Sequence, residues 1–304
     1  MAAPTLPAPA KINLHLRITG RRADGYHLLD TSFAFTDLCD SLTFAPHRER
    51  IVLTCDRPEL AGAANLVHRL LDAFRRRHAV REGLRIAIEK RIPQQAGLGG
   101  GSSDAATALL VANQAWGIRL DRRAMIDFAA PFGADIPCFL FGAACRTGGS
   151  IGERLSPWRA PLPDGALLLA HPGAGLSTAE VFAEHDAIEG SLTTDGGGDT
   201  MRAPSPPALG SNDLFDAATM LLPPLANLLD AMRARARTAW MSGSGSCCAA
   251  LFDHREAAAA CAGELVRRGL ARWCHVGSLR RHHPVDDDAV AQAAAMLEQG
   301  CDGA

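Results

Sequence analysis

Hydrophobic and polar residues alternate without a break over residues 10–18. An alternation with a period of two predicts a β-strand with one apolar face, and it places Lys11 and Asn13 on the other face. The same alternation over 84–88 predicts a second strand. Between the two, over 65–78, apolar residues recur at helical spacing, so the chain mixes strands and helices from its start.

A glycine-rich segment follows the second strand and leads into an apolar helical pattern at 105–116. Ser102, Ser103 and Asp104 are residue types that accept hydrogen bonds from the first amides of a helix, so we expect them to cap it. Gly117 stands where a glycine commonly ends a helix. The predicted order here is strand, glycine-rich loop and helix.

The rest of the chain alternates short apolar segments with clusters of Gly, Pro and Ser. Residues 223–224, Pro-Pro, separate two predicted helices because proline disrupts a helix interior. Residues 189–211 have few large apolar side chains and are expected to form a mobile surface insertion. We predict strands at 167–170, 238–241 and 272–279. We predict helices at 121–130, 213–222 and 225–237. A further helix, capped by Asp253 and Glu256, should end before Gly269, and the tail after Arg281 has a weak helical pattern.

The composition is that of an ordinary globular protein, with 304 residues, 47% of them hydrophobic, and a formal net charge of −2. A chain of this length lies near the size at which one core divides into two, so we expect two lobes with a cleft between them. The charge balance argues against a nucleic-acid-binding protein, and no apolar run reaches the roughly 20 residues that span a bilayer. Residues 1–9 lack the features of a signal peptide, and the nine cysteines include no CxxC pair. We therefore expect a cytoplasmic protein with unpaired thiols.

Residues 97–103, Gly-Leu-Gly-Gly-Gly-Ser-Ser, carry the strongest chemical signal. Bare backbone amides at the start of a helix, where the helix dipole is positive, bind anions such as phosphate. The segment lacks the lysine of a P-loop, and it matches the dinucleotide fingerprint only in part, at Gly97, Gly99 and Ser102. A plain flexible turn is the alternative interpretation.

Three further clusters could take part in chemistry. Lys11 and Asn13 share a strand face, which could also be a solvated outer face. Asp135 precedes an apolar segment, where it could simply cap a short helix. Residues 242–246, Ser-Gly-Ser-Gly-Ser, could form only a tight hairpin, and the adjoining pair 247–248, Cys-Cys, has no identifiable partner for a thiol nucleophile. With the glycine-rich loop, a cation and a carboxylate suit phosphoryl transfer to a hydroxyl.

Five motifs resemble, in content and in order, those of the GHMP kinase superfamily, and the resemblance covers roughly residues 6–279. It implies an α+β fold with a two-lobed GHMP kinase architecture. The N-terminal, ribosomal-protein-like α/β lobe would cover 1–148 and bind nucleotide, the C-terminal, ferredoxin-like lobe would cover 149–281, and a tail would cover 282–304. The motifs are Pro9-Ala10-Lys11-Ile12-Asn13-Leu14, Asp24-Gly25-Tyr26-His27, Gly97-Leu98-Gly99-Gly100-Gly101-Ser102-Ser103, Gly133-Ala134-Asp135-Ile136-Pro137 and Ser242-Gly243-Ser244-Gly245.

The Asp-Gly-Tyr-His motif resembles in particular the superfamily members that use ATP to phosphorylate the 2-hydroxyl of a cytidine-diphosphate-linked methylerythritol in isoprenoid biosynthesis. The resemblance implies that Asp135 is the catalytic base and that Lys11 polarises the acceptor hydroxyl. It also implies Mg²⁺, which would arrive with ATP. The residues that the resemblance implies for the binding of ATP are Asn65, Leu66, Lys90, Pro93, Gln94, Gln95, Ala96, Gly97, Leu98, Gly99, Gly100, Gly101, Ser102 and Ser103.

For the acceptor substrate the resemblance implies Asn13, Tyr26, His27, Phe182 and Gly243. Tyr26 and Phe182 would stack on the two faces of the cytosine, and the imidazole of His27 would read the edge of the base. We expect a small-molecule substrate, no nucleic-acid or membrane partner, and a monomer or homodimer.

Other interpretations stay open at the level of the sequence. One is a superfamily member that acts on another small alcohol, such as a homoserine or mevalonate kinase. Another is a non-catalytic binding module, because the N-terminal lobe resembles a fold also used in ribosomal proteins. The partial dinucleotide fingerprint leaves a third, a dinucleotide-dependent oxidoreductase.

Overall fold

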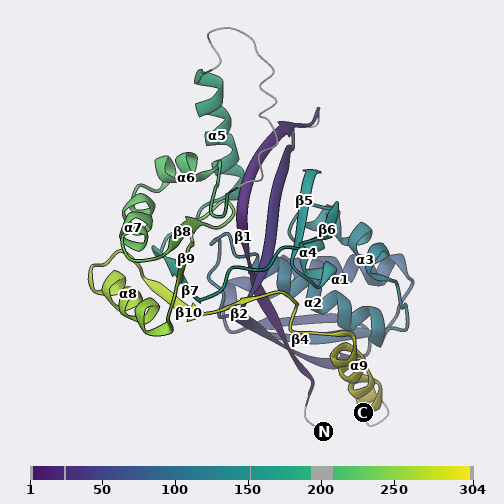
Figure 1. Ribbon diagram of the computed structural model, residues 1–304. Helices are drawn as coiled ribbons and strands as arrows, with labels where there is room; N and C mark the ends of the chain where they lie inside the picture. Colours follow the sequence, from purple (N-terminus) through teal and green to yellow (C-terminus); the bar gives the residue numbers. More distant parts are fainter. Residues whose placement is uncertain (1–2, 24, 151, 193–207, 302–304) are drawn as a thin grey trace.

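The computed structural model describes residues 3–23, 25–150, 152–192 and 208–301. Two long strands, β1 (Thr5–Arg21) and β2 (His27–His47), pair antiparallel and run through the middle of the molecule. Helices and shorter strands lie on both sides of this pair (Figure 1). The α+β fold with two lobes that was predicted from the sequence is therefore confirmed.

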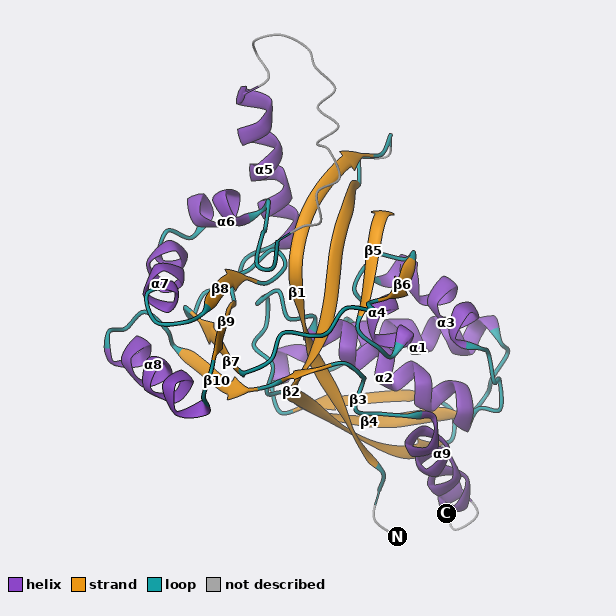
Figure 2. Ribbon diagram, viewed as in Figure 1, coloured by secondary structure: helices purple, strands orange, loops and turns teal. Residues whose placement is uncertain are grey.

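The larger sheet and its helices form the N-terminal lobe (Figure 2). β2 lies at its centre and pairs with β1, β4, β5 and β11. The other strands of this sheet are β3 (Ile51–Cys55), β4 (Gly83–Glu89), β5 (Cys145–Ser150), β6 (Leu155–Pro157) and β11 (Leu279–Arg280). The helices of this lobe are α1 (Leu66–Arg77), α2 (Gly100–Ala115), α3 (Arg122–Ala129), α4 (Ile136–Phe141) and α9 (Asp287–Cys301), with short 3-10 helices at Pro58–Leu60 and Ala130–Phe132.

The C-terminal lobe is built on a smaller antiparallel sheet with the strand order β10-β7-β9-β8. Its strands are β7 (Ala166–His171), β8 (Thr238–Met241), β9 (Cys248–Phe252) and β10 (Trp273–Gly277). Its helices are α5 (Thr178–Leu192), α6 (Phe215–Leu221), α7 (Pro224–Arg233) and α8 (Arg255–Arg267), and they lie on the opposite side of β1 and β2 from α1–α4 (Figure 1).

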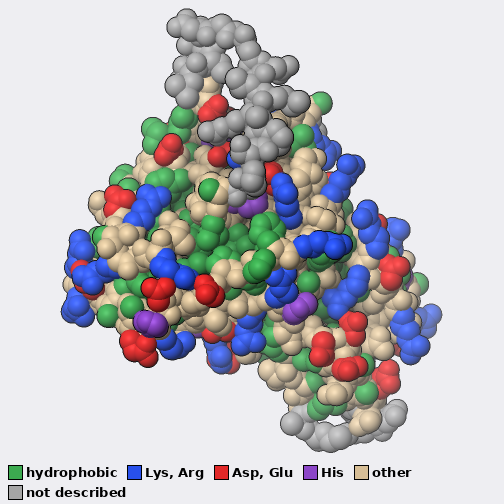
Figure 3. All heavy atoms as spheres, viewed as in Figure 1, with side chains coloured by type: hydrophobic (Ala, Val, Ile, Leu, Met, Phe, Trp, Pro, Cys, Tyr) green, Lys and Arg blue, Asp and Glu red, His purple; other side chains and the backbone are tan. Residues whose placement is uncertain are grey.

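β1 is buried on both faces over most of its length, because each lobe packs against it. Ile12 and Leu14 share a hydrophobic cluster with Trp240 of β8. The indole Nε1 of Trp240 donates a hydrogen bond of 2.7 Å to the carbonyl oxygen of Asn13. The interpretation of the polar face of this strand as solvated is therefore wrong, since Lys11 and Asn13 are each only 3% exposed. In the view of Figure 3, hydrophobic side chains gather at the centre, where the lobes meet.

Three local predictions are wrong. α2 begins at Gly100, so residues 102–104 lie inside the helix and do not cap it; the N-cap is Gly99, in the left-handed conformation. The N-cap of α8 is His254 without a side-chain hydrogen bond, and Asp253 instead pairs with Arg237. The single strand predicted at 272–279 is split into β10 and β11, which belong to different sheets.

The predicted insertion at 189–211 falls partly outside the described residues, which omit 193–207. Up to Leu192 the chain is helical as part of α5, so the start of the insertion was placed too early. The tail does contain a helix, α9, and it packs against α2. Among the described residues, no helix has the length and the apolar character that a membrane crossing requires.

The remaining predicted strands and helices are present, with ends that differ by a few residues. The sequence analysis missed β2, β3, β5, β6 and α5. β2 is 21 residues long: residues 30–36 are all buried, because both faces are covered there, and burial alternates over 37–45. The sequence over 28–36, Leu-Leu-Asp-Thr-Ser-Phe-Ala-Phe-Thr, does not alternate between apolar and polar residues, so its periodicity does not reveal a strand.

Candidate active site

A cavity of about 600 Å³ lies between the two lobes. Its wall combines residues of β1, of the glycine-rich loop and of the segment before α4 with residues of α5 and of the loop between β8 and β9. Predicted site residues that line it are Lys11, Asn13, Asn65, Leu66, Lys90, Pro93, Gln94, Gln95, Ala96, Gly97, Gly99, Gly100, Gly101, Ser102, Asp135, Phe182 and Gly243. The predicted site residues Tyr26, His27, Leu98 and Ser103 do not line it.

The glycine-rich loop presents the N-terminus of α2 to the cavity. The first hydrogen bond of the helix runs from the amide of Ser103 to the carbonyl oxygen of Gly99, at 2.9 Å. The amides of Gly100, Gly101 and Ser102 therefore have no partner within the helix. These three residues line the cavity. Free amides at the positive end of a 16-residue helix make an anion site of the kind that binds phosphate.

A hairpin loop of the C-terminal lobe, residues 242–246, supports the glycine-rich loop. The hydroxyl of Ser242 donates to the carbonyl oxygen of Gly97 at 3.1 Å and accepts from the amide of Asn13 at 3.2 Å. Gly97 has a φ of +72°, and a Cβ there would meet the carbonyl oxygen of Ser242 at 2.1 Å. Residues 242–246 do join β8 and β9 as a hairpin, but they do more than turn the chain, since the loop also brings Gly243 to the cavity wall.

The two cysteines that follow this loop are not placed for nucleophilic chemistry. Both side chains are fully buried. Burial raises the pKa of Cys248 to about 12 and raises that of Cys247 well above its ordinary value. Both residues therefore stay protonated thiols at neutral pH, and a thiolate is the reactive form of cysteine.

Lys11 and Asp135 meet in the cavity wall. The Nζ of Lys11 lies 3.2 Å from Oδ2 of Asp135, and the lysine side chain is 3% exposed whereas the aspartate is 35% exposed. Asp135 is the N-cap residue of α4, but its side chain makes no capping hydrogen bond. The carboxylate is thus turned away from the helix amides and toward the ammonium, which is not what a simple cap would do.

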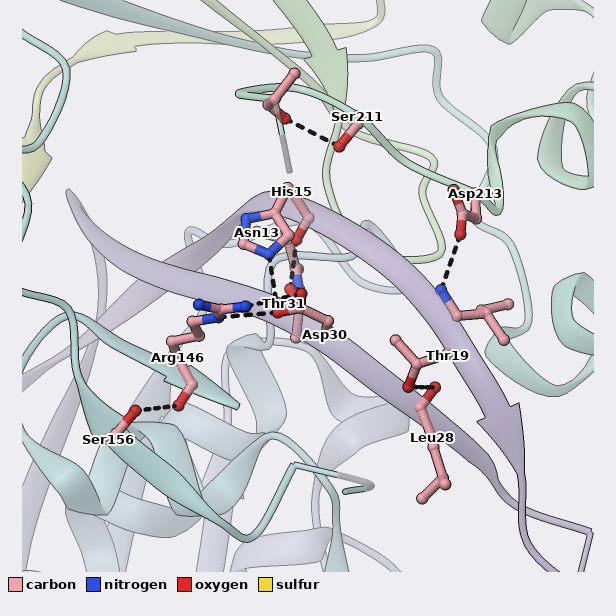
Figure 4. Close-up of polar contacts among 12 residues, drawn as sticks. Asn13, His15, Thr19, Leu28, Asp30, Thr31, Arg146, Ser156, Ser211 and Asp213 are labelled. Atoms are coloured by element: carbon pink, nitrogen blue, oxygen red, sulfur yellow. Dashed lines mark hydrogen bonds and ion pairs between the residues drawn. The ribbon is translucent and has the colours of Figure 1, made fainter. Parts of the chain in front are cut away.

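Asn13 and Thr31 orient this ammonium. The amide oxygen of Asn13 accepts from Nζ of Lys11 at 2.7 Å, and its Nδ2 donates to Oγ1 of Thr31 at 2.8 Å. Thr31 in turn donates to the carbonyl oxygen of His15 at 2.5 Å. Thr31 lies on β2, opposite β1, as Figure 4 shows. The sequence analysis missed Thr31 because it predicted no strand there.

A second polar group, also drawn in Figure 4, joins β1, β2 and β5. Asp30 accepts two hydrogen bonds of 2.9 Å from Arg146 and lies 3.4 Å from Nε2 of His15. Burial by itself would raise the pKa of Asp30, but the bonds from Arg146 and His15 outweigh it and hold the pKa below its usual range. Burial also lowers the pKa of His15. These contacts fix the register of the strands that carry Asn13 and Thr31.

Lys90 lines the cavity, but two carboxylates hold its ammonium. Nζ donates to Oδ2 of Asp40 and, at 2.7 Å, to Oδ2 of Asp104. Asp40 also accepts from the backbone amides of Arg91 and Ile92, at 2.6 and 2.8 Å. Burial raises the pKa of Asp104 to about 7, although the Lys90 ammonium opposes the shift. This buried group joins the end of β4 to α2 beneath the glycine-rich loop.

Of the residues assigned to the cytosine, Phe182 lines the cavity and His27 contacts it. The ring of His27 stacks on that of Phe182, with a centroid distance of 4.8 Å and an interplanar angle of 23°. The Nε2 of His27 is 2.7 Å from Oδ1 of Asp186. Tyr26 is 62% exposed. The structure therefore brings His27 and Phe182 together, and it leaves Tyr26 on the surface next to them.

The carboxylates of the cavity wall decide how a metal could be held. They are Asp135, which pairs with Lys11, and Asp104, which pairs with Lys90. In the part of the chain that the structure describes, no group of three or more His, Cys, Asp or Glu side chains could hold a metal ion. The residues present therefore fit a metal that is carried by the phosphates of a nucleotide, with few or no direct protein ligands.

Comparisons with known proteins agree with this geometry. The family model described as GHMP kinases N terminal domain matches residues 65–143, and the one described as GHMP kinases C terminal matches 207–271. The 4-diphosphocytidyl-2-C-methyl-D-erythritol kinase of Ralstonia nicotianae is 38% identical over 283 residues, which cover 92% of this chain and 94% of the relative. That of Bordetella parapertussis is 39% identical over 251 residues, 81% of each chain.

Solved structures point the same way. A crystal structure of 4-(cytidine 5'-diphospho)-2C-methyl-D-erythritol kinase superimposes with a TM-score of 0.72 at 34% identity, covering 91% of this chain and 99% of the other. The homoserine kinase of Cytophaga hutchinsonii, at 17% identity and a TM-score of 0.62 over 93% of this chain and 96% of the other, shares the fold alone. The chain therefore belongs to the 4-diphosphocytidyl-2-C-methyl-D-erythritol kinase family of the GHMP kinases.

Proposed function

We propose that this kinase transfers the γ-phosphoryl group of ATP to the 2-hydroxyl of 4-diphosphocytidyl-2-C-methyl-D-erythritol, with Asp135 and Lys11 at the reacting atoms. One observation carries the assignment of these two residues. A carboxylate and an ammonium 3.2 Å apart face a cavity into which a helix N-terminus also points. Phosphoryl transfer depends chiefly on positioning and on electrostatic stabilisation, and this arrangement supplies both.

The chemistry follows from the roles of the two side chains. The hydroxyl oxygen attacks the γ-phosphorus, the bond to the oxygen of ADP breaks, and the hydroxyl proton passes to the Asp135 carboxylate. The Lys11 ammonium stabilises the negative charge that develops on the attacking oxygen. The ammonium donates one of its three hydrogens to the amide oxygen of Asn13. Its other two hydrogens are then directed toward the Asp135 carboxylate and the hydroxyl of the substrate. The 35% exposure of Asp135 leaves room for the substrate to approach.

The amides of Gly100, Gly101 and Ser102 are our candidates for the polyphosphate contact. They are unpaired in the helix and lie in the same wall as Lys11. Mg²⁺ would arrive on the ATP phosphates and neutralise part of their charge. Asn65 and Leu66 remain candidates for the adenine, although the side chain of Asn65 already accepts from the amide of Val67 as the N-cap of α1.

Three expectations from the sequence stay proposals. We propose the division into 1–148, 149–281 and 282–304, noting that the models for the N- and C-terminal domains match within the first two of these ranges. A cytoplasmic location agrees with the eight described cysteines, which are all free thiols. A monomer or homodimer is the expected assembly.

The decisive measurement is a phosphoryl-transfer assay with ATP and the cytidylyl substrate, followed by ³¹P NMR of the product. Asp135→Asn removes the proton acceptor and retains the shape of the side chain. We expect kcat to fall by about 10²–10⁴-fold, the usual contribution of a positioned acid or base. Binding of ATP, measured by calorimetry, should be unchanged within about twofold because Asp135 is not one of the phosphate-binding amides.

Asp127→Asn is the matched control, since Asp127 is an exposed carboxylate on α3 that pairs with Arg123. It should retain full activity. A kcat in Asp135→Asn above one tenth of the unaltered value would contradict the role of Asp135. Absence of turnover of the cytidylyl substrate in the unaltered protein, with turnover of homoserine or mevalonate, would favour the other kinases of the superfamily.

A further inference from the structure

A segment of the C-terminal lobe, residues 208–214, lies beside β1 and leads into α6. The amide of Leu16 donates to the carbonyl oxygen of Ser211 at 2.8 Å, and the amide of Asp213 donates to the carbonyl oxygen of Leu16 at 3.0 Å. The side chain of Asp213 accepts from the amide of Ile18 at 2.9 Å, a bond drawn in Figure 4. The segment is therefore fixed to the strand that supplies the ammonium of the site.

Within this segment, the side chain of Asn212 makes three hydrogen bonds to the backbone. Its Nδ2 donates to the carbonyl oxygens of Met241 and Gly243, each at 2.8 Å. Its Oδ1 accepts from the amide of Leu214 at 3.0 Å. Both hydrogens and the oxygen of the side-chain amide are therefore engaged. Since Met241 ends β8 and Gly243 lies in the loop that follows, Asn212 joins that loop to the segment beside β1.

Gly243 lies against the Lys11 ammonium. A Cβ on Gly243 would be 3.4 Å from Nζ of Lys11, 3.2 Å from Oδ1 of Asn13 and 3.2 Å from the carbonyl oxygen of Gly97. The φ of Gly243 is +58°, in the left-handed region that glycine adopts without steric cost. Because a glycine restricts its own backbone so little, the conformation of this loop depends on the contacts that hold its peptide groups.

We propose that Asn212 is a positioning residue for the transfer step, because it holds the peptide of Gly243 against the Lys11 ammonium. The inference rests on the proposed function. The carbonyl oxygen of Gly243 accepts from Asn212. Without that donor the peptide is free to rotate and to offer its oxygen to the ammonium, in competition with Asp135. Asn212 is not among the residues that line the cavity, so it acts through the loop.

Asn212→Asp is the informative substitution. The carboxylate keeps the size of the side chain and still accepts from the amide of Leu214, but it has no hydrogen for the carbonyl oxygens of Met241 and Gly243. We expect kcat, expressed per ATP site counted by calorimetry, to fall by about tenfold. The KM for ATP should stay within about twofold, since Ser242 keeps its bonds to the glycine-rich loop and to β1.

A double-mutant cycle with Lys11→Met separates positioning of the ammonium from a general loosening of the site. If Asn212 acts through Lys11, Asn212→Asp has no further effect on kcat once the ammonium is absent. A general loosening would instead lower kcat by the same factor in both backgrounds. Asn212→Ser removes the side-chain amide without adding a charge, and it takes the place of Asn212→Asp in the cycle if the aspartate variant does not fold.

Asn113→Asp is the matched control. The side chain of Asn113 also donates to and accepts from the backbone, in both cases that of Leu120 at 2.9 Å, near the opposite end of α2 from the glycine-rich loop. This substitution should lower the free energy of unfolding and leave kcat unchanged.

Two results would overturn the inference and leave the proposed function intact. One is a kcat in the Asn212 variant within about twofold of the unaltered value. The other is an equal loss in the Lys11→Met background. If the unaltered protein does not turn over the cytidylyl substrate at all, the proposed function itself is wrong.

Discussion

At the scale of single residues, the site depends on the orientation of one amide group. Asn13 places its oxygen on Lys11 because Thr31 accepts from its nitrogen, and Thr31 accepts there because its own proton goes to the carbonyl of His15. This chain of hydrogen bonds leaves the Asn13 amide no alternative orientation. Thr31 therefore affects the position of the Lys11 ammonium through the side chain of Asn13.

Thr31→Val tests this dependence, because it keeps the shape of a side chain that is 1% exposed and removes its hydroxyl. The Asn13 amide then loses the acceptor that orients it, and we expect kcat to fall by about tenfold, which corresponds to roughly 1.4 kcal/mol and lies within the range for one hydrogen bond. The KM for ATP should not change. Thr31→Ser, which restores the hydroxyl, should recover most of the activity.

Thr43→Val is the control for this experiment. Thr43 lies farther along the same strand, and its hydroxyl bonds to that of Thr5 near the surface. It should match the unaltered enzyme in kcat. If Thr31→Val folds and keeps kcat within twofold, the hydrogen-bond chain does not position Lys11.

At the scale of elements, the C-terminal segment closes the N-terminal lobe. β11 pairs with β2, and Val290 and Leu297 of α9 are buried in the same hydrophobic cluster as α1 and α2. His283, between them, is 7% exposed and packs edge-on against Phe35 at 5.5 Å. Its Nδ1 accepts from the amide of Val285 at 3.2 Å. Burial lowers the pKa of His283 to about 4, so the folded protein holds this histidine neutral.

The lowered pKa predicts a loss of stability in mild acid. Between about pH 6.5 and pH 4 the unfolded chain binds a proton at residue 283 that the folded chain does not, so the contribution is present above pH 6.5 and is lost as the pH falls. One proton corresponds to about 1.4 kcal/mol per pH unit. His283→Asn keeps an acceptor for Val285 and cannot titrate, so its free energy of unfolding should fall less steeply over this range in urea titrations.

His282→Asn provides the comparison, because His282 is the exposed neighbour of His283. It should retain the steep acid dependence of the unaltered protein. Equal slopes for His283→Asn and the unaltered protein would show that His283 does not titrate differently in the folded and unfolded states.

At the scale of the whole molecule, β1 belongs to the cores of both lobes. One of its ends packs in the N-terminal cluster through Leu6, its middle packs against Trp240, and Leu16 joins the C-terminal cluster. The cavity lies where the two lobes face each other across this strand. If either lobe moved away from β1, the apolar surface of β1 that this lobe covers would become exposed to water.

We therefore predict that both lobes unfold in one transition. Urea titrations followed by far-ultraviolet circular dichroism and by tryptophan fluorescence should coincide, as in a two-state protein. Trp240→Phe removes the donor to the Asn13 carbonyl and should lower the free energy of unfolding by about 1–3 kcal/mol. Two separated transitions in the unaltered protein would contradict this account of β1.

Sequence patterns predicted elements whose apolar residues recur at a regular spacing. The alternation at 10–18, the helical spacing at 65–78 and the glycine-rich loop before α2 all correspond to observed elements, and their motifs identified the family. The patterns missed β2, because the first half of this strand does not alternate between apolar and polar residues. They also misplaced the start of α2, where Gly99 adopts a left-handed conformation that lets Gly100 begin the helix.

The sequence by itself determined which side chains are available for the chemistry: a cradle of glycine amides, one ammonium on β1 and one carboxylate before α4. Their residue types and local spacing are properties of short segments, so they can be recognised without the fold. Only the tertiary structure decided that Lys11 lies 3.2 Å from Asp135, that Lys90 is held by two carboxylates, and that His27 rests between Phe182 and Asp186. These contacts join different elements of the fold, and the packing of sheets and helices around their hydrophobic cores brings those elements together.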